Sequence, residues 1–598
     1  MTEGIKKRNE IAREYKWKLE DAYRDQESWE QDFKRVQDKL PEIVEFKGRL
    51  SESAGVLYNA LKMLEELQRR SEKLYVYAKM RRDEDNAHTG YQTLYERIER
   101  LNVQVSGATA FVIPEITAID QEEMEQFMQQ EENLKNYRHF IEELWRQKSH
   151  ILSPEEERVL AMSADLATAA QNIFTMFNNA DIKFPQIKDE NGQEVELTKG
   201  RYGRYMESSD RRVRQEAFTA LYHSYGKFKN TLASTLASAV KRDIFYARVR
   251  QYPSALEAAL DQDNIAVDVY NQLIATVHDK MDYMYRYMKL RKKILGVDQL
   301  HMYDIYTPLV SEYRVEIPYE EAREKVLAGL KPLGEEYLAL LKNGIESGWI
   351  DVYENEGKTS GAYSWGTFDT HPYVLMNYDN KLDDVFTLAH ELGHSLHSHY
   401  SNHNQPYIYS QYTIFLAEVA STVNESLLID FLLKQSGNRQ EKMYLINHYL
   451  EQFRGTVYRQ TMFAEFEKII HEMVEQGRGL TPEELCRIYR ELNSLYFGPD
   501  VVIDPEIEVE WSRIPHFYSA FYVYKYATGF SAATAIKEKI LTEGEPAVTR
   551  YLDFLKSGSS DYPLNLLHKA GVDLTSPQPV EKALDYFGYL LDEMEKLL

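Results

Sequence analysis

The stretch DDVFTLAHELGHSLHSHY, Asp383 to Tyr400, combines two acidic residues at its start with apolar residues at helical spacing and four histidines. Acidic residues favour the N-terminal end of a helix, where they can cap free N–H groups and interact with the helix dipole. The pattern therefore predicts a helix that begins near Asp383 and buries one apolar side, made of Val385, Phe386, Leu388, Ala389, Leu392 and Leu396.

This predicted helix contains the pattern H-E-x-x-H. His390 and His394 are four residues apart and lie on one helix face, so both imidazoles can bind one metal ion about 2.0–2.1 Å away. Glu391 is rotated by about 100° around the helix from His390, which places its carboxylate beside the ion. There it can take a proton from an attacking water molecule, so we predict a metal centre with Glu391 as general base.

The third ligand is predicted from the sequence that follows. A catalytic zinc site has three protein ligands and one open position. Residues 395–417 contain no Asp or Glu, and the first carboxylate after them is Glu418, in the apolar helical stretch FLAEVASTVNESLLIDFLL. We predict Glu418 as the third ligand. Glu425, two turns further, is a candidate acceptor for an imidazole N–H; a buried salt bridge is the alternative.

Three further histidines and one glycine of this predicted helix are not assigned to the metal site. We expect His397, His399 and His403 to be packed or surface histidines rather than ligands. Glycine inside a helix costs about 1 kcal/mol relative to alanine. Gly393 therefore indicates that something approaches the helix closely, and we expect the preceding sheet or a bound substrate.

The residues before this helix predict a small sheet. Trp349 to Tyr378 contain short β-branched and aromatic runs separated by glycine and polar turns. An extended peptide can be held by adding itself as a strand to a sheet edge. GAYSWG, with Gly361 and Tyr363, and HPYVLMNY, starting at His371, are the candidates for that edge. A hairpin that only packs on the helix is the alternative.

Most of the chain predicts helices, because apolar residues recur three and four positions apart with charges between them. The segment FPQIKDENGQEVELT, 184–198, is an exception, since its Asn191-Gly192 pair between alternating residues predicts a β-hairpin. We expect this hairpin to end an N-terminal helical domain of residues 1–200, followed by a second domain of residues 201–598. The predicted fold class is mainly α.

Composition excludes several classes of function. The 598 residues have a net charge of −24, which opposes binding to nucleic acid or to an anionic lipid surface. No apolar run is long enough for a transmembrane helix, and the charged start does not fit a signal peptide, so we expect a cytoplasmic protein. Cys486 is the only cysteine, so any metal must be held by His, Asp or Glu.

A tyrosine-rich stretch, IPHFYSAFYVYKYATGF from Ile514 to Phe530, is a further candidate for chemistry. Tyr518, Tyr522 and Tyr526 repeat every four residues, so on a helix their phenols would line one face. His516 follows Pro515 at the expected helix start. Such groups can stabilise a developing oxyanion, although a tyrosine stripe buried in the core is the alternative.

Together HELGH, FLAEVAST and PHFYSAFYVYKYATG resemble the M3 family of zinc metallopeptidases, in its oligoendopeptidase F group, which is thimet oligopeptidase-like. The resemblance implies a two-lobed helical zincin with a deep central channel, one zinc ion per chain and a small sheet next to the HExxH helix. The catalytic peptidase domain would be 201–598. The implied roles are zinc ligation by His390, His394 and Glu418, catalysis by Glu391, His516 and Tyr522, and substrate contact by Gly361, Tyr363, Tyr518 and Tyr526. Members differ in tyrosine spacing, so which phenol reaches the oxyanion stays open.

We therefore predict a zinc-dependent endopeptidase that hydrolyses internal bonds of short to medium unstructured oligopeptides, with no nucleic-acid or membrane partner; the oligomeric state is left open. A peptidyl carboxypeptidase is one alternative, because Arg513 or Lys525 could hold a terminal carboxylate. A non-catalytic peptide-binding protein with a structural zinc is another. Structural sites have four ligands, however, and such a site would give Glu391 no role.

Overall fold

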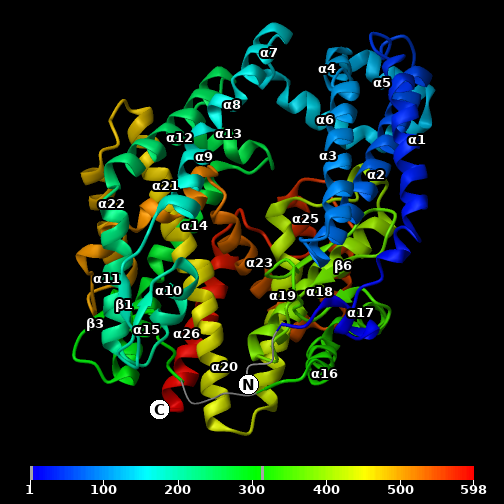
Figure 1. The fold of residues 1–598 in the computed structure, drawn as a ribbon. Helices are drawn as coiled ribbons and strands as arrows, with labels where there is room; N and C mark the ends of the chain where they lie inside the picture. Colours follow the sequence, from blue (N-terminus) through cyan, green and yellow to red (C-terminus); the bar gives the residue numbers. More distant parts are fainter. Residues whose placement is uncertain (1–4, 311–315) are drawn as a thin grey trace. The chain divides into compact units, whose positions relative to one another are not determined.

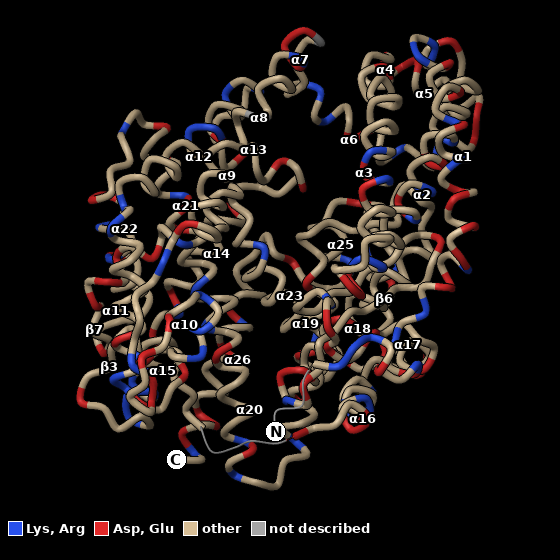
Figure 2. The backbone as a smooth tube through the Cα atoms, viewed as in Figure 1, with Lys and Arg blue, Asp and Glu red and all other residues tan. Residues whose placement is uncertain are grey.

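The computed structural model describes residues 5–310 and 316–598. The chain forms two compact units, and each unit is assembled from three separate stretches of sequence (Figure 1). Unit 1 contains residues 1–149, 315–431 and 536–571, and unit 2 contains residues 150–314, 432–535 and 572–598. Acidic and basic positions are interspersed along the helices of both units (Figure 2).

Unit 1 consists mainly of helices, and it contains the predicted histidine helix as α18. Its helices are α1 (Gln26–Val44), α2 (Ala54–Glu84), α3 (Thr89–Thr109), α4 (Val112–Ala118), α5 (Gln121–Gln130), α6 (Arg138–Arg146), α16 (Tyr319–Gly329), α17 (Gly334–Glu346), α18 (Leu382–Asn404), α24 (Glu545–Leu555), α25 (Pro563–Lys569) and most of α19 (Ile414–Gln435).

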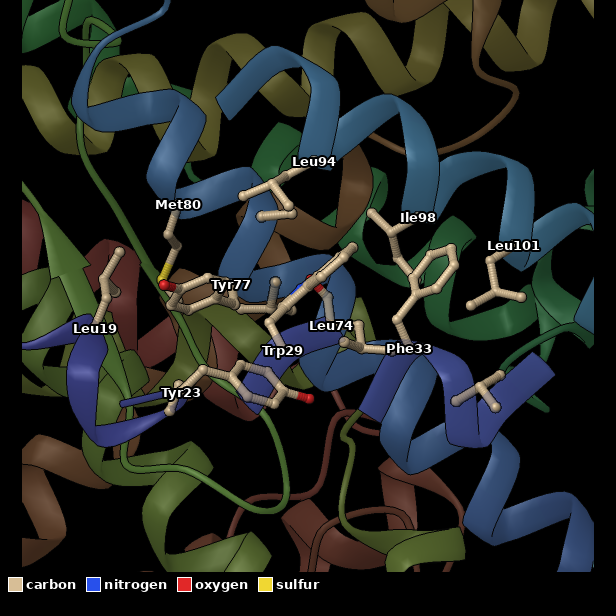
Figure 3. Packing of buried hydrophobic residues seen from close by; sticks show 14 of the residues in the cluster. Leu19, Tyr23, Trp29, Phe33, Leu74, Tyr77, Met80, Leu94, Ile98 and Leu101 are labelled. Carbon is tan, nitrogen blue, oxygen red and sulfur yellow. The ribbon is translucent and has the colours of Figure 1, made fainter. Parts of the chain in front are cut away.

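A core of large side chains holds α1, α2 and α3 together (Figure 3). Asp25 caps α1 by accepting a hydrogen bond from the Ser28 amide, and apolar residues then recur at helical spacing. Trp29 is fully buried, stacks on Phe33, and donates its indole N–H to the carbonyl of Leu74 on α2. The bond satisfies the polar edge of a large apolar group that would otherwise be buried without a partner.

A three-stranded sheet packs next to α18 in unit 1. Its strands are β4 (Ile350–Asp351), β5 (Tyr363–Trp365) and β6 (Tyr373–Leu375), in the order β4-β6-β5. β6 pairs parallel with β4 and antiparallel with β5, so β5 is an edge strand. Both β5 and β6 contact α18. The predicted sheet beside the histidine helix is confirmed.

Unit 2 is also mainly helical. Its helices are α7 (Pro154–Met162), α8 (Ala164–Ala167), α9 (Ala169–Met176), α10 (Lys199–Met206), α11 (Arg211–Gly226), α12 (Lys229–Val249), α13 (Ala255–Asp261), α14 (Val267–Asp279), α15 (Met281–Leu295), α20 (Arg439–Gln452), α21 (Arg459–Glu475), α22 (Pro482–Phe497), α26 (Gln578–Lys596) and the start of α23 (Tyr524–Glu543). Short strands β3 (Leu300–His301) and β7 (Val501–Val502) pair in parallel.

The predicted hairpin is present in unit 2 as β1 (Gln186–Lys188) and β2 (Glu194–Glu196), paired antiparallel. Gly192 in its turn has φ +77°, a conformation that glycine adopts without steric cost. The expected division into residues 1–200 and 201–598 does not coincide with the compact units, because stretches from both parts of the chain build each unit. Along the described residues, no helix combines the length and apolar character needed to cross a membrane.

Candidate metal centre

Helix α18 begins as its acidic start predicts. The Asp384 carboxylate accepts hydrogen bonds from the amides of Lys381 and Asp379, at 2.9 and 2.8 Å, and so satisfies free donors at the N-terminal end. Six residues after Asp384 the helix presents His390, and four residues further on it presents His394. Their Nε2 atoms lie 3.1 Å apart, so the two imidazoles converge on one point.

Glu418 on α19 completes a group of three ligands. Its Oε2 lies 3.4 Å from the Nε2 of His390 and 3.8 Å from the Nε2 of His394. Ligand atoms arranged tetrahedrally about 2.0–2.1 Å from a zinc ion lie about 3.3 Å from one another. The three separations bracket that value, so the side chains fit a zinc ion. Among the described residues, this is the one group of His, Cys, Asp or Glu side chains with metal-binding geometry.

Gly393 lies at a close contact between α18 and α19. A Cβ atom at this position would lie 2.6 Å from the Cα of Ser421 and 2.8 Å from the carbonyl oxygen of Ala420. The expectation that the sheet or a substrate explains this glycine is therefore wrong. The neighbour is the backbone of α19, which must come this near because its Glu418 has to reach the two histidines of α18.

Glu425 binds the outer nitrogen of His390. Its Oε1 lies 2.5 Å from Nδ1, which orients the ring and leaves Nε2 directed at the ligand group. Burial by itself would lower the pKa of His390, but the nearby Glu425 carboxylate raises it to about 9. The pKa of His394 is lowered to about 3, by burial and by the neighbouring His390.

Glu391 is buried where α18 packs against the edge strand β5, and the nearby amide of Ser364 on β5 favours the charged form of its carboxyl. Burial raises the pKa of Glu391 to about 7, with a further contribution from the negative charge of Glu418. The hydroxyl of Ser395 contacts that of Ser364 at 2.8 Å and also ties β5 to α18.

Two further residues at the centre, Asn424 and Ser364, were not predicted from the sequence. Asn424, fully buried on α19, donates to the carbonyl of Ala389 and accepts from the hydroxyl of Tyr337. It therefore links α19 to both α18 and α17. Asn424 stands at helical spacing from the apolar Ala420, Leu427 and Leu428, which was the available signal. Ser364 carried no comparable signal, because its contact with Ser395 depends on how β5 packs on α18.

The predicted edge residues Gly361 and Tyr363 have different environments. Gly361 has φ +86° and no atoms near the position of a Cβ. The Tyr363 hydroxyl instead donates to Asp83 on α2, at 2.8 Å, so its phenol belongs to the packing of unit 1. Any contact of Tyr363 with a peptide would therefore involve its backbone.

The other histidines of α18 have the packing roles expected of them. His397 is buried and stacks on Tyr412 with ring centroids 3.6 Å apart. His399 and His403 stack on each other at 3.9 Å. None of the three belongs to the ligand group.

The tyrosine-rich stretch does not form the expected continuous helix. Pro515–Tyr518 is a short 3-10 helix, Phe521 has φ +53°, and α23 begins only at Tyr524. The predicted stripe is therefore wrong, because a turn separates Tyr518 from the other two tyrosines. Tyr518 is buried and its hydroxyl contacts that of Thr235 at 2.9 Å.

His516, Tyr522 and Tyr526 form a partly exposed aromatic cluster in unit 2. Their ring centroids lie 5.4 to 6.3 Å apart. Burial lowers the pKa of His516, so its imidazole is neutral at neutral pH. The cluster offers two phenols and a neutral imidazole that can donate hydrogen bonds to a substrate.

The sequence pattern described as "Peptidase family M3" matches residues 204–586, and the pattern described as "Oligopeptidase F" matches residues 115–184. The first match covers more than half of the chain. The chain belongs to peptidase family M3. It is a metallopeptidase of the oligoendopeptidase F type, and the geometry of His390, His394 and Glu418 is consistent with the metal site of such an enzyme.

Individual relatives support the same assignment over the full length of this M3 peptidase. It is 49% identical to "Oligopeptidase PepF" of Bacillus subtilis (strain 168), over 99% of this chain and 88% of that protein. A crystal structure of oligoendopeptidase-F from Enterococcus faecium is 40% identical, covers 96% of this chain and 99% of its own, and has a TM-score of 0.75. A Chlamydophila abortus crystal structure matches 100% of both chains at 35% identity, with a TM-score of 0.93.

Proposed function

We propose that this M3 peptidase binds one zinc ion per chain through His390, His394 and Glu418 and hydrolyses internal bonds of short to medium unstructured oligopeptides. The observation that carries the proposal is the convergence of the three ligand atoms within 3.1 to 3.8 Å of one another. The ligand group contains three side chains among the described residues, which matches a catalytic site with an open position rather than a closed structural site.

Glu391 is the proposed general base. Zinc, when bound, supplies a Lewis acid that makes water a better nucleophile near neutral pH and polarises a carbonyl. A carboxyl whose pKa is raised to about 7 can both accept a proton from water and return it to a leaving amine at neutral pH. The contact between the hydroxyls of Ser364 and Ser395 keeps β5 next to this carboxyl.

Strand β5 is the proposed site of substrate backbone binding. Among the described residues its strand partner is β6, so its other edge could pair with a peptide in extended conformation. Because β5 packs on α18 beside Glu391, a peptide added to this strand would lie next to the general base. Gly361, which precedes β5, leaves room for a peptide backbone.

His516 and Tyr522 are the proposed donors to the oxyanion, and Tyr526 is a proposed substrate contact. Their partial exposure and mutual clustering in unit 2 support these roles. The earlier assignment of Tyr518 to substrate binding has less support, since its hydroxyl already contacts Thr235.

Arg513 and Lys525 could hold a terminal carboxylate in a carboxypeptidase, but each is paired with an acid within unit 2. This pairing favours an endopeptidase. Arg513 donates to Glu510 at 3.1 Å, and the ammonium of Lys525 lies 2.6 Å from a carboxylate oxygen of Asp263. A carboxypeptidase needs a cation free to hold the terminal carboxylate of its substrate.

A peptide with both ends blocked tests the proposal. An internally quenched peptide whose N- and C-termini are chemically capped is incubated with the zinc-loaded protein, and the products are identified by mass spectrometry. We expect cleavage at internal bonds, and we expect Glu391→Gln to keep its zinc while kcat falls by about 10²–10⁴-fold. Release of C-terminal fragments only from unblocked peptides, or undiminished turnover by Glu391→Gln, would overturn the endopeptidase mechanism.

A further inference from the structure

The turn before Tyr522 has a backbone conformation that its residue disfavours. Phe521 has φ +53°, in the left-handed region that bulky side chains rarely adopt. Such a residue persists only where its surroundings impose the conformation, and such residues concentrate at functional sites. The next residue in the chain is Tyr522, the proposed oxyanion donor.

Glu467 on α21 makes a direct contact with this turn. It is fully buried, and its Oε1 accepts a hydrogen bond from the amide of Phe521 at 3.3 Å. Within the described residues, its Oε2 has no hydrogen-bond partner. Burial raises the pKa of Glu467 well above its ordinary value, so the carboxyl is uncharged at neutral pH.

Packing alone does not explain an acid at this position. A buried carboxyl with one oxygen unpartnered is less favourable than an apolar side chain of similar size. The one hydrogen bond that its side chain makes within the described residues goes to the amide of the disfavoured residue. The distinctive property of Glu467 is therefore that its carboxyl accepts a hydrogen bond from the Phe521 amide.

Neighbouring contacts fix the same turn from other directions. The ring of Phe521 packs on His471, one helical turn after Glu467, with centroids 4.6 Å apart. Arg242 on α12 donates to the carbonyl of Tyr518 at 3.1 Å, so the start of the turn is held as well. Between these anchors, the chain has little freedom to choose another path.

We propose that Glu467 is a positioning residue for catalysis: by accepting the Phe521 amide, it holds the turn that directs Tyr522 into its cluster with His516 and Tyr526. This inference rests on the proposed role of Tyr522. Glu467 itself touches no substrate, and it acts through the backbone of the turn.

Replacing the acceptor tests the proposal. Glu467→Met keeps the length and buried volume of the side chain but accepts no hydrogen bond, whereas Glu467→Gln keeps an acceptor oxygen. We expect Glu467→Met to lower kcat by about tenfold or more with KM changed less than about threefold and zinc content unchanged. Glu467→Gln should keep kcat within about threefold. Should the Met variant not fold, Glu467→Asp, which withdraws the carboxyl by one methylene, should show the same loss of kcat.

A double variant tests whether Glu467 acts through Tyr522. If it does, adding Glu467→Met to Tyr522→Phe should lower kcat less than about threefold further, because the two effects share one hydroxyl. Tyr458→Phe is the matched control, since it removes a buried hydrogen bond to the carbonyl of Lys280 elsewhere in unit 2. It should keep its kcat.

Different results would contradict the role of Glu467, the role of Tyr522 and the hydrolytic function. The proposal for Glu467 is wrong if the Met or Asp variant keeps its kcat, if Gln loses as much as Met, or if the double variant shows full additive losses. If Tyr522→Phe keeps its kcat, the roles of both Tyr522 and Glu467 are overturned. The proposed hydrolytic function is tested separately, by the activity of Glu391→Gln.

Discussion

At the scale of single residues, the two ring nitrogens of His390 have different partners. His390 directs Nε2 at the ligand group while Nδ1 contacts Glu425. Glu418 and Glu425, two turns apart on α19, therefore serve the same histidine from its two sides. The first is the proposed ligand, and the second contacts the opposite side of the ring.

Removing these two glutamates should have unequal effects on zinc. Glu418→Ala deletes a ligand, so we expect the protein to lose its zinc on dialysis and to become inactive. Glu425→Ala leaves three ligands and should weaken zinc binding by about 10–100-fold. Zinc content after dialysis measures both effects. Full retention of zinc by the Glu418 variant would refute its assignment as a ligand.

Replacing each of the three tyrosines by phenylalanine should have different effects on kcat. Tyr522→Phe removes one hydroxyl and keeps the ring, so kcat should fall by about 10²-fold, or about 2.7 kcal/mol, with KM little changed. Tyr518→Phe is the natural control, because its hydroxyl contacts Thr235. It should cost about 1 kcal/mol of stability and leave kcat intact. If Tyr522→Phe, Tyr518→Phe and Tyr526→Phe all keep kcat within about threefold, the oxyanion donor is not one of these phenols.

His397 should make stability depend on pH. Burial lowers its pKa to about 3, whereas the unfolded chain has an ordinary histidine pKa of about 6.5. Below pH 6.5 the unfolded state binds a proton that the folded state does not, so stability falls as pH falls toward 3. At pH 5 the loss is about 2 kcal/mol. His397→Phe keeps a ring against Tyr412, and its thermal midpoint should fall less than that of the wild type between pH 7.5 and 5. Parallel curves would contradict this origin.

At the scale of elements, the centre is a crossing of two helices. Gly393 allows the backbone of α19 to approach α18, and Asn424 bonds to the carbonyl of Ala389 across the same contact. The edge strand β5 adds a third element, through the contact between the hydroxyls of Ser364 and Ser395 next to Glu391. Ligands and base are therefore positioned by backbone contacts between elements as much as by their own side chains.

Gly393→Ala should disturb this crossing. The added methyl would lie 2.6 Å from the Cα of Ser421, so the helices must separate, which typically costs about 1–3 kcal/mol. Because the ligands come from both helices, we also expect weaker zinc binding. Gly107→Ala in α3 is the control, since nothing lies within 4 Å of the added atom, and it should stabilise the protein slightly. Equal thermal midpoints and equal zinc affinity for Gly393→Ala and wild type would contradict the close crossing.

At the scale of the whole molecule, the candidate metal ligands are three partly exposed side chains in a chain with extensive apolar cores elsewhere. Unit 1 has apolar clusters between its helices, such as the one that joins α1, α2 and α3 (Figure 3). Folding of this chain should therefore not require the metal, unlike the folding of small zinc modules.

Removal of zinc by a chelator should abolish peptide hydrolysis and leave the far-UV circular dichroism nearly unchanged. The thermal midpoint should fall, because a ligand that binds the folded state stabilises it. Adding zinc back should restore activity at one equivalent per chain. A requirement for two equivalents, or loss of helical signal in the apo protein, would contradict the proposed stoichiometry or the independence of the fold.

The sequence alone determined those features that depend on local spacing. Four-residue spacing placed His390 and His394 on one helix face, an acid-free interval singled out Glu418, and the Asn191-Gly192 pair marked a hairpin. Tertiary structure decided what brings distant segments together: α19 as the neighbour of Gly393, Ser364 as a neighbour of Glu391, and the turn at Phe521 that breaks the tyrosine stripe. The physical reason is that helical periodicity fixes positions along one element, whereas contacts between elements depend on backbone approach and on buried hydrogen bonds that no local pattern records.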